Sequence, residues 1–179
     1  MTDDNLPEPL LALARRVIEE NRAAGLRVAT AESCTGGLVT AALTEIAGCS
    51  DVVEGGFTSY SNAFKTQHLG VSEDVLETFG AVSVATAWAM AQGVLHRTRA
   101  DVAVAVTGIA GPGGGSERKP VGTVVFARAS RDGDPEDVTA DLREFGDIGR
   151  AAIRRQAALC ALELLLPGAT MASDEDGEP

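Results

Sequence analysis

A serine followed by two glycines is the first segment whose residue types could do chemistry. Ser33 lies in the run Ala31–Gly37 (AESCTGG), between a predicted strand and a predicted helix. Such a turn places a side chain at the edge of a sheet and presents free backbone N–H groups at a helix start. Ser33 is therefore a candidate nucleophile, and the N–H groups near Thr35, Gly36 and Gly37 are candidate donors to an oxyanion. The alternative is that Ser33 only caps the helix and the glycines only form the turn.

A lysine five residues after a tyrosine supplies the candidate base. Tyr60 and Lys65 follow a predicted strand, and the two histidines of the chain, His68 and His96, are too scattered for a Ser-His-Asp triad. A lysine held away from water has a lowered pKa and can act as a base toward serine. The alternative is that Lys65 is an ordinary surface lysine.

A glycine-rich loop follows the most apolar strand candidate. Its residues, Thr107–Pro120, include Gly108, Gly111, Gly113, Gly114 and Gly115. In open α/β sheets ligands bind at the carboxyl ends of strands, and backbone amides exposed by glycines can hold a carboxylate or a phosphate. The loop has no Gly-Lys-Ser/Thr ending and does not open a helix directly, so it is neither a P-loop nor a dinucleotide fingerprint.

The elements that must position these segments alternate between helix and strand. Apolar spacing and capping residues predict helices over residues 10–25, 38–46, 62–68, 72–80, 83–97 and 150–166. Strands are predicted over residues 27–31, 52–60, 102–106, 121–129 and 138–145, and the last two form a hairpin around a turn at 131–135. This order predicts an α/β fold, a three-layer α/β/α sandwich around a mixed, mostly parallel sheet.

Length and composition favour one globular domain. The chain has 179 residues, of which 45% are apolar and only 4% aromatic, so the core must consist mainly of Ala, Val, Leu and Ile. We expect residues 1–9 to form a flexible acidic segment, residues 10–166 to form the domain, and residues 167–179 to form a flexible acidic tail.

Charge and cysteine content restrict the partners. A formal net charge of −11 repels phosphate backbones and argues against a nucleic-acid partner. Three cysteines without a CxxC spacing argue against a disulfide framework and fit a reducing compartment. No apolar run approaches the roughly 20 residues that cross a bilayer, and the N-terminus does not resemble a signal peptide. We expect a cytoplasmic protein with no membrane partner, no metal and no cofactor.

Five collinear segments resemble one family. They are Ala31–Gly37, Tyr60-Ser61-Asn62 with Lys65, Gly80–Ser83, Thr107–Pro112 and Lys119–Val124. Together they resemble the CinA C-terminal domain family over about residues 10–166. Stand-alone members of that family are nicotinamide-nucleotide amidohydrolases. The resemblance implies hydrolysis of the carboxamide of nicotinamide mononucleotide, which gives nicotinate mononucleotide and ammonia.

The resemblance also implies roles for individual residues. Ser33 matches the nucleophile, Lys65 the general base and Tyr60 a residue that supports this dyad. The implied substrate-binding residues are Thr35, Gly36, Gly37, Ser50, Thr107, Gly108 and Arg150. Arg150 follows a Gly-Asp-Ile-Gly run that is two residues longer than the family's usual Gly-Asp, and Arg154 is the alternative. Either arginine could bind the substrate phosphate as a bidentate donor.

Three other functions stay open from the sequence. They are a non-catalytic regulatory or binding domain, an amidohydrolase for a different small amide, and a nucleic-acid binder, which the charge disfavours. We also expect a homo-oligomer, with a dimer as the simplest case. The Ala-rich helices near residues 88–95 and 150–166 could pack against a second subunit or within the core.

Overall fold

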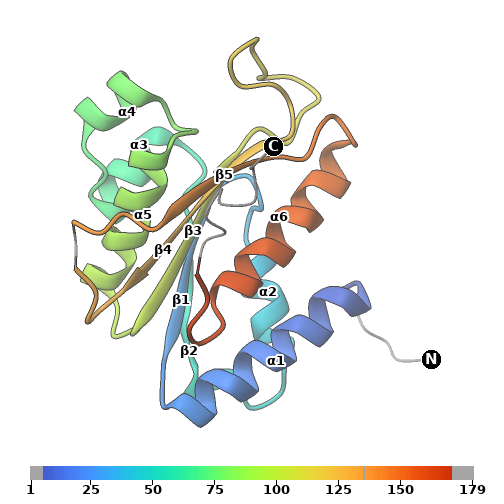
Figure 1. Ribbon diagram of the computed structural model, residues 1–179, viewed down its shortest axis with the longest axis vertical. Coiled ribbons are helices and arrows are strands. Elements are labelled where there is room, and N and C mark those ends of the chain that lie inside the picture. Colours follow the sequence, from blue (N-terminus) through green and yellow to red (C-terminus); the bar gives the residue numbers. More distant parts are fainter. Residues whose placement is uncertain (1–5, 135, 171–179) are drawn as a thin grey trace, which may run out of the picture.

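A five-stranded sheet forms the middle layer of the computed structural model, which describes residues 6–134 and 136–170 (Figure 1). The strand order β2-β1-β3-β4-β5 corresponds to Val53–Thr58, Val28–Glu32, Val102–Gly108, Thr123–Ser130 and Ala140–Glu144. Strand β1 pairs in parallel with β2 and β3, whereas β4 pairs antiparallel with both β3 and β5. Only β4 is reversed, so the sheet is mixed and four of its five strands share one direction.

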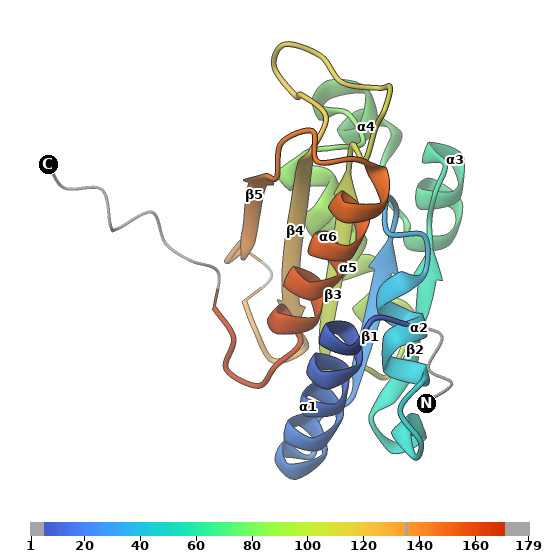
Figure 2. The same ribbon diagram turned by 90° about the vertical axis from the view of Figure 1, so that its right-hand side faces the viewer.

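Helices cover both faces of this sheet (Figures 1 and 2). On one face lie α1 (Glu8–Ala24), α2 (Leu38–Thr44) and α6 (Arg150–Leu164), which contact one another. On the other face lies α5 (Val84–Arg97), with α4 (Glu73–Phe79) packed against it. The predicted three-layer sandwich is therefore confirmed. None of the helices in the described ranges is long and apolar enough to cross a membrane.

Strand β3 shows how the sequence divides the core into two halves. Because successive side chains of a strand point to opposite faces, its alternating Val and Ala residues separate. Val102, Val104 and Val106 pack in the cluster that includes α1 and α6, whereas Ala103 and Ala105 pack in the cluster around α5. Because the side chains on the α5 side are small, this helix packs close to the sheet, and the core can be filled with few aromatic residues.

The two Ala-rich helices bury their apolar faces within the chain. Helix α5 buries Ala87, Met90, Ala91 and Val94, and α6 buries Ile153, Ala157, Ala158 and Ala161. These side chains therefore belong to the core rather than to a subunit interface. The homo-oligomer stays a prediction.

Two predicted boundaries are wrong in instructive ways. Helix α1 begins at Glu8 rather than at residue 10, because its second residue, Pro9, lies in the first turn, where a missing N–H costs no helical hydrogen bond. The predicted helix 62–68 divides into α3 (Asn62–Phe64) and a π-helical turn, η2 (Lys65–Leu69). Residues 1–5, residues 171–179 of the predicted tail and Pro135 of the predicted turn lie outside the described residues.

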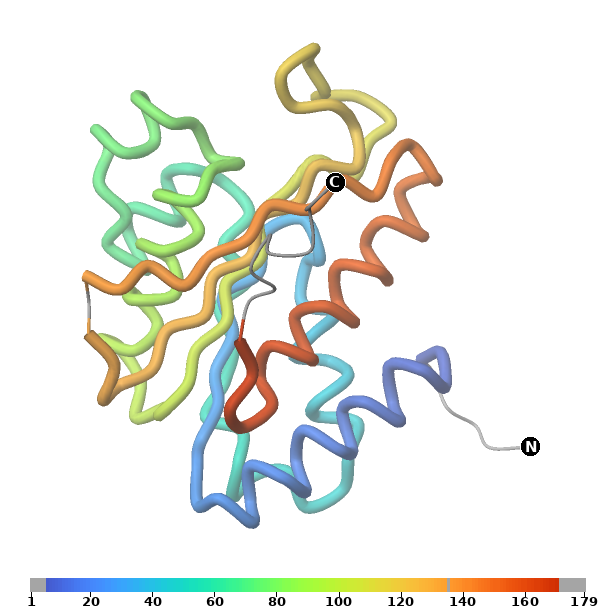
Figure 3. The backbone as a smooth tube through the Cα atoms, viewed as in Figure 1, coloured from blue at the N-terminus to red at the C-terminus, as the bar shows by residue number. Residues whose placement is uncertain are grey.

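The carboxyl ends of β1, β2 and β3 meet at one edge of the sheet, because these strands are parallel. Ser33 follows β1, Ser59 and Tyr60 follow β2, and Thr107 lies near the end of β3. The loop between β3 and β4 extends beyond this edge, on the same side of the molecule as the start of α6 (Figure 3). The three segments that the sequence singled out are thus brought to one place.

The turn η2 is held against α5 by a glycine. A Cβ atom at Gly93 would lie 2.1 Å from the carbonyl oxygen of Leu69, so only glycine permits this approach. Arg97 closes the contact by donating to the same carbonyl at 3.1 Å. The position of Lys65, the first residue of η2, therefore depends on the surface of α5.

We expect Gly93→Ala to destabilise the protein, although glycine to alanine in a helix usually stabilises by about 1 kcal/mol. The added methyl group must push η2 away from α5, and overpacking of this kind costs about 1–3 kcal/mol. Urea unfolding measures the change. Gly113→Ala is the control, since nothing lies within 4 Å of a Cβ there. An unchanged or increased free energy of unfolding for Gly93→Ala would contradict the tight contact.

Candidate active site

Ser33 is placed by the end of strand β1. Its N–H donates to the carbonyl of Val106 at 2.9 Å, which ties it to the neighbouring strand β3. The alternation of β1 puts Val28, Thr30 and Glu32 on the α2 face, and the Ser33 side chain points to the other side, toward η2. The side chain is 8% exposed, so a substrate in the adjoining cavity can still reach it.

Lys65 reaches Ser33 from η2 across the edge of the sheet. Its Nζ lies 3.1 Å from Ser33 Oγ and donates to the carbonyl of Ser59 at 2.8 Å and to that of Tyr60 at 3.1 Å. The lysine is only 1% exposed. The predicted Ser33–Lys65 pair is therefore brought into contact, and the surface-lysine alternative is wrong.

Burial lowers the pKa of Lys65, because the charged ammonium loses hydration. The nearby Cys34 thiol opposes this shift, but no carboxylate of the described residues forms an ion pair with Lys65. The lowered pKa increases the share of the neutral amine, which is the form that can accept a proton.

Tyr60 and Arg150 lie at the mouth of the site. The tyrosine side chain is 63% exposed, and its contact with Lys65 is made by its main-chain carbonyl. Its hydroxyl lies 3.4 Å from Nη2 of Arg150, whose Nη1 donates to the carbonyl of Gly111 at 2.9 Å. Arg150 thus joins Tyr60 to the glycine-rich loop, at the first residue of α6.

A cavity of about 200 Å³ adjoins the Ser33–Lys65 pair. Its lining residues are Ser33, Cys34, Tyr60, Lys65, Ala81, Val82, Thr107, Gly108, Ala110 and Arg150. The hydroxyl of Thr107 donates to the carbonyl of Ala81 at 2.8 Å, which holds this wall in place. Gly108 has no room for a side chain, because a Cβ there would lie 2.8 Å from Val124. Three of the predicted substrate-binding residues, Thr107, Gly108 and Arg150, are therefore brought together in the lining of this cavity.

The donors for an oxyanion differ from those expected. The N–H of Gly36 donates to the carbonyl of Ser33 at 3.1 Å, and that of Gly37 donates to Glu32 at 3.0 Å. Two of the three predicted donors, Gly36 and Gly37, are thus already engaged, and only the N–H of Thr35 remains from the predicted set. By contrast, the N–H groups of Cys34 and Thr35 donate to no oxygen atom among the described residues.

Thr35 lies behind the cavity rather than in its lining. It is fully buried, and its carbonyl accepts a hydrogen bond of 2.8 Å from Nη2 of Arg154. This contact directs Arg154 toward the turn after β1, whereas Arg150 lines the cavity. Of the two arginines that the sequence left open, Arg150 is the one that lines the cavity at Ser33.

Ser50 was predicted to bind the substrate, but it does not line the cavity at Ser33. Ser50 lies in the short turn η1 (Cys49–Asp51), before β2 and beside the amino end of β1, where Val28 donates to the carbonyl of Val52. Ser33 lies at the other end of β1. At about 3.3 Å per residue, the five residues of this strand separate the two serines by roughly 17 Å. Within one chain Ser50 does not reach the cavity.

Cys34 lines the cavity next to Ser33 but is a poor nucleophile. Burial raises the pKa of its thiol to about 12, so the reactive thiolate is scarce at neutral pH.

Two groups of the site were not predicted from the sequence: the carbonyl of Ser59, which binds Lys65, and the side chain of Glu32, which binds the turn after β1. The only available signal was a glutamate at the end of an otherwise uncharged strand, VATAE.

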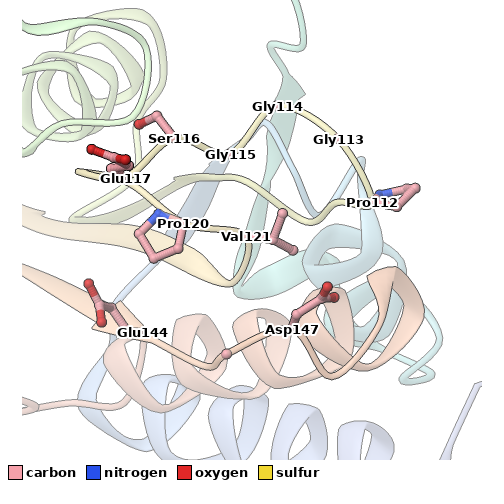
Figure 4. A pocket seen from close by; sticks show the side chains of 11 residues that line it. Pro112, Gly113, Gly114, Gly115, Ser116, Glu117, Pro120, Val121, Glu144 and Asp147 are labelled. Atoms are coloured by element: carbon pink, nitrogen blue, oxygen red, sulfur yellow. The ribbon is translucent and has the colours of Figure 1, made fainter.

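A larger cavity of about 770 Å³ lies beside the glycine-rich loop (Figure 4). The loop residues Pro112–Glu117 line one side, and Glu144 at the end of β5 and Asp147 from the connection between β5 and α6 line the other. Three carboxylates and no lysine or arginine line this space, which therefore disfavours a phosphate. Within the described ranges, no group of three or more His, Cys, Asp or Glu residues is arranged to hold a metal.

The fold and the site define a three-layer α/β protein with a serine–lysine pair of the kind that acts in acyl transfer. The family model described as "CinA C-terminal domain" matches residues 10–168, and the chain belongs to this family.

Relatives and solved structures of this family are similar along nearly the whole chain. "Nicotinamide-nucleotide amidohydrolase PncC" of Escherichia coli (strain K12) is 48% identical over 165 residues, which cover 92% of this chain and 95% of that protein. The protein of the same name from Enterobacter agglomerans is 53% identical over 145 residues, 81% of this chain and 86% of its own. The crystal structure of competence/damage inducible protein CihA from Agrobacterium tumefaciens has a TM-score of 0.86 and 53% identity, covering 90% of this chain and 96% of that one.

The lowered pKa of Lys65 predicts how the stability of the protein depends on pH. Between that pKa and the ordinary value of about 10.4 in the unfolded chain, the unfolded state binds one proton more than the native state. The free energy of unfolding therefore rises with pH across this window. We expect a steeper rise below about pH 10 for the wild type than for Lys65→Met, because only the wild type contains the buried amine.

Urea unfolding at several pH values measures these slopes. Ser33→Ala keeps the buried amine and should retain the wild-type slope. Equal slopes for the wild type and Lys65→Met would show that Lys65 keeps its ordinary pKa in the native protein.

Proposed function

We propose that this protein is a nicotinamide-nucleotide amidohydrolase, which converts nicotinamide mononucleotide and water into nicotinate mononucleotide and ammonia. Relatives that carry this name cover up to 92% of the chain, as reported above. The observation that supports the chemistry most directly is the contact between Ser33 Oγ and the buried Nζ of Lys65.

The hydrogen-bond partners of Lys65 account for its role as a base. A neutral amine has two N–H groups and one lone pair, and carbonyl oxygens can only accept. The two N–H groups are taken by the carbonyls of Ser59 and Tyr60. The lone pair is then directed at Ser33, whose hydroxyl donates its proton to it. Two fixed carbonyls thus orient the amine for proton transfer.

The reaction begins when Lys65 takes the proton of Ser33 and Oγ attacks the carboxamide carbon. The resulting oxyanion is bound by the free N–H groups of Cys34 and Thr35, and removal of one such donor typically costs about 10²–10³ in kcat. The ammonium of Lys65 then protonates the leaving nitrogen, so the C–N bond breaks and ammonia departs. Water hydrolyses the acyl-enzyme by the same proton route, which restores Ser33 and gives the carboxylate.

Arg150 is the proposed ligand of the substrate phosphate. It lines the cavity, it belongs to the first turn of α6, and N–H groups at a helix start favour anions. The carboxylates of the neighbouring larger cavity keep the phosphate out of that space. Tyr60 helps by placing its carbonyl on Lys65 and its hydroxyl near Arg150.

Ser33→Ala should abolish ammonia release from nicotinamide mononucleotide and leave the fold intact, because the variant removes only the oxygen that attacks. Lys65→Ala should also lose most activity. Ammonia release by the wild type should continue in the presence of a chelator, since no step uses a metal. Near-wild-type turnover by Ser33→Ala would rule out the nucleophile, and activity that vanishes with the chelator would rule out the metal-free route.

Arg150→Ala should weaken binding of the mononucleotide by roughly 10- to 100-fold, because a hydrogen bond to a charged group is worth about 1.5–3 kcal/mol. Turnover of nicotinamide riboside, which lacks the phosphate, should change little. Steady-state kinetics with both compounds measure this ratio. Arg155→Ala, an exposed arginine of the same helix, is the control. A ratio that Arg150→Ala leaves unchanged would place the phosphate elsewhere.

A further inference from the structure

The carboxylate of Glu32 is the most strongly hydrogen-bonded side chain near the site, and the mechanism above does not use it. Glu32 is the last residue of β1 and is 1% exposed. Its Oε2 accepts from the N–H groups of Gly37 and Val39 at 3.0 Å each. Its Oε1 accepts from the N–H of Thr40 at 2.8 Å and from its hydroxyl at 2.7 Å. Four donors thus satisfy a buried carboxylate that has no cationic partner among the described salt bridges.

Neighbouring residues keep this network in place. The hydroxyl of Thr40 is used toward Glu32, so the hydroxyl of Thr30, 2.7 Å away, must donate to the Thr40 oxygen. Gly56 on β2 leaves room for both, because a Cβ there would lie 2.1 Å from Thr40 Oγ1 and 2.6 Å from Thr30 Oγ1. Three elements, β1, β2 and α2, therefore contribute to holding one carboxylate.

The hydrogen bonds to Glu32 determine which backbone N–H groups of the turn after β1 remain without an oxygen acceptor. Glu32 lies directly before Ser33 and fixes the start of α2 directly after the turn. With Gly37, Val39 and Thr40 bound to Glu32 and Gly36 bound to the Ser33 carbonyl, the N–H groups of Cys34 and Thr35 remain. The bond from Gly36 also orients the Ser33–Cys34 peptide, whose N–H is one of the two free donors.

We propose that Glu32 is a positioning residue for catalysis: by binding the start of α2, it holds the turn so that Ser33 Oγ faces Lys65 and two N–H groups face the oxyanion. Glu32 touches neither the substrate nor the reacting atoms. The proposal rests on the proposed function of Ser33, and it predicts a defect in the chemical step rather than in substrate binding.

Glu32→Gln is the sharpest test, because it keeps the size of the side chain. A glutamine amide nitrogen is a donor, so at least one backbone N–H of Gly37, Val39 or Thr40 must lose its acceptor. A displacement near 1 Å at a reacting group can cost about 10²-fold. We expect kcat for ammonia release to fall about 10- to 100-fold, with KM nearly unchanged, since an interaction needed only in the transition state is lost. Thr40→Val removes the hydroxyl that donates to Glu32 and accepts from Thr30, but it keeps the three backbone donors to Glu32, so it should show a smaller fall.

The control for a merely structural effect is Asn21→Ala. Asn21 is fully buried and donates to the carbonyls of Val17 and Leu165, away from the turn. This variant should lose stability in urea unfolding and keep the wild-type kcat. The proposal is overturned if Glu32→Gln keeps the wild-type kcat, or if Asn21→Ala loses kcat to the same extent at an equal loss of stability.

Labelling of Ser33 by a fluorophosphonate separates this proposal from the proposed function. The rate of labelling depends on the Ser33–Lys65 geometry and the oxyanion donors, but not on the natural substrate. If the wild type is labelled yet does not hydrolyse the mononucleotide, the substrate assignment fails, and slower labelling of Glu32→Gln still supports Glu32. Equal labelling rates for the two proteins, or no labelling of the wild type, would overturn the role of Glu32.

Discussion

Burial of a lysine amine beside a serine is the constraint on which the rest of the structure depends. An amine removed from water is costly unless its hydrogen bonds are satisfied, and a nearby carboxylate would favour its charged form. The protein meets both conditions by surrounding Lys65 with the carbonyls of Ser59 and Tyr60 instead of an acid. The π-helical turn, the end of β2 and the glycine of α5 all serve to hold that arrangement.

Strand β1 keeps the two buried ionisable side chains of the site region, Glu32 and Lys65, on opposite faces of the sheet. Its alternation directs Glu32 toward α2 and Ser33 toward η2, so the carboxylate binds backbone N–H groups while the amine binds carbonyls. An ion pair between Glu32 and Lys65 would raise the pKa of the amine and remove the base. Glu32 and Ser33 are adjacent in the sequence, yet one binds the start of α2 and the other belongs to the reactive pair with Lys65.

The surroundings of the pair explain how an acidic protein can accept an anionic ligand. The formal net charge is −11, yet the cavity at Ser33 contains Lys65 and Arg150 and no carboxylate. Carboxylates gather instead in the neighbouring larger cavity, behind the glycine-rich loop (Figure 4). Because fields within a cleft are set mostly by its own lining, the local charge rather than the net charge governs recognition.

The sequence by itself determined the layers and the pair. Alternating helices and strands gave the three-layer fold, and the apolar run at 102–106 marked a strand that lies in the middle of the sheet. Resemblance to a family joined Ser33 to Lys65, which local patterns alone left open. Tertiary structure decided where each group points. Ser50 lies at the far end of β1 from Ser33, the N–H groups of Gly36 and Gly37 are already bound, and Tyr60 contacts Lys65 through its main-chain carbonyl. A sequence states which donors and acceptors exist, but only the folded chain determines which of them remain free, because each hydrogen bond formed removes a partner from the site.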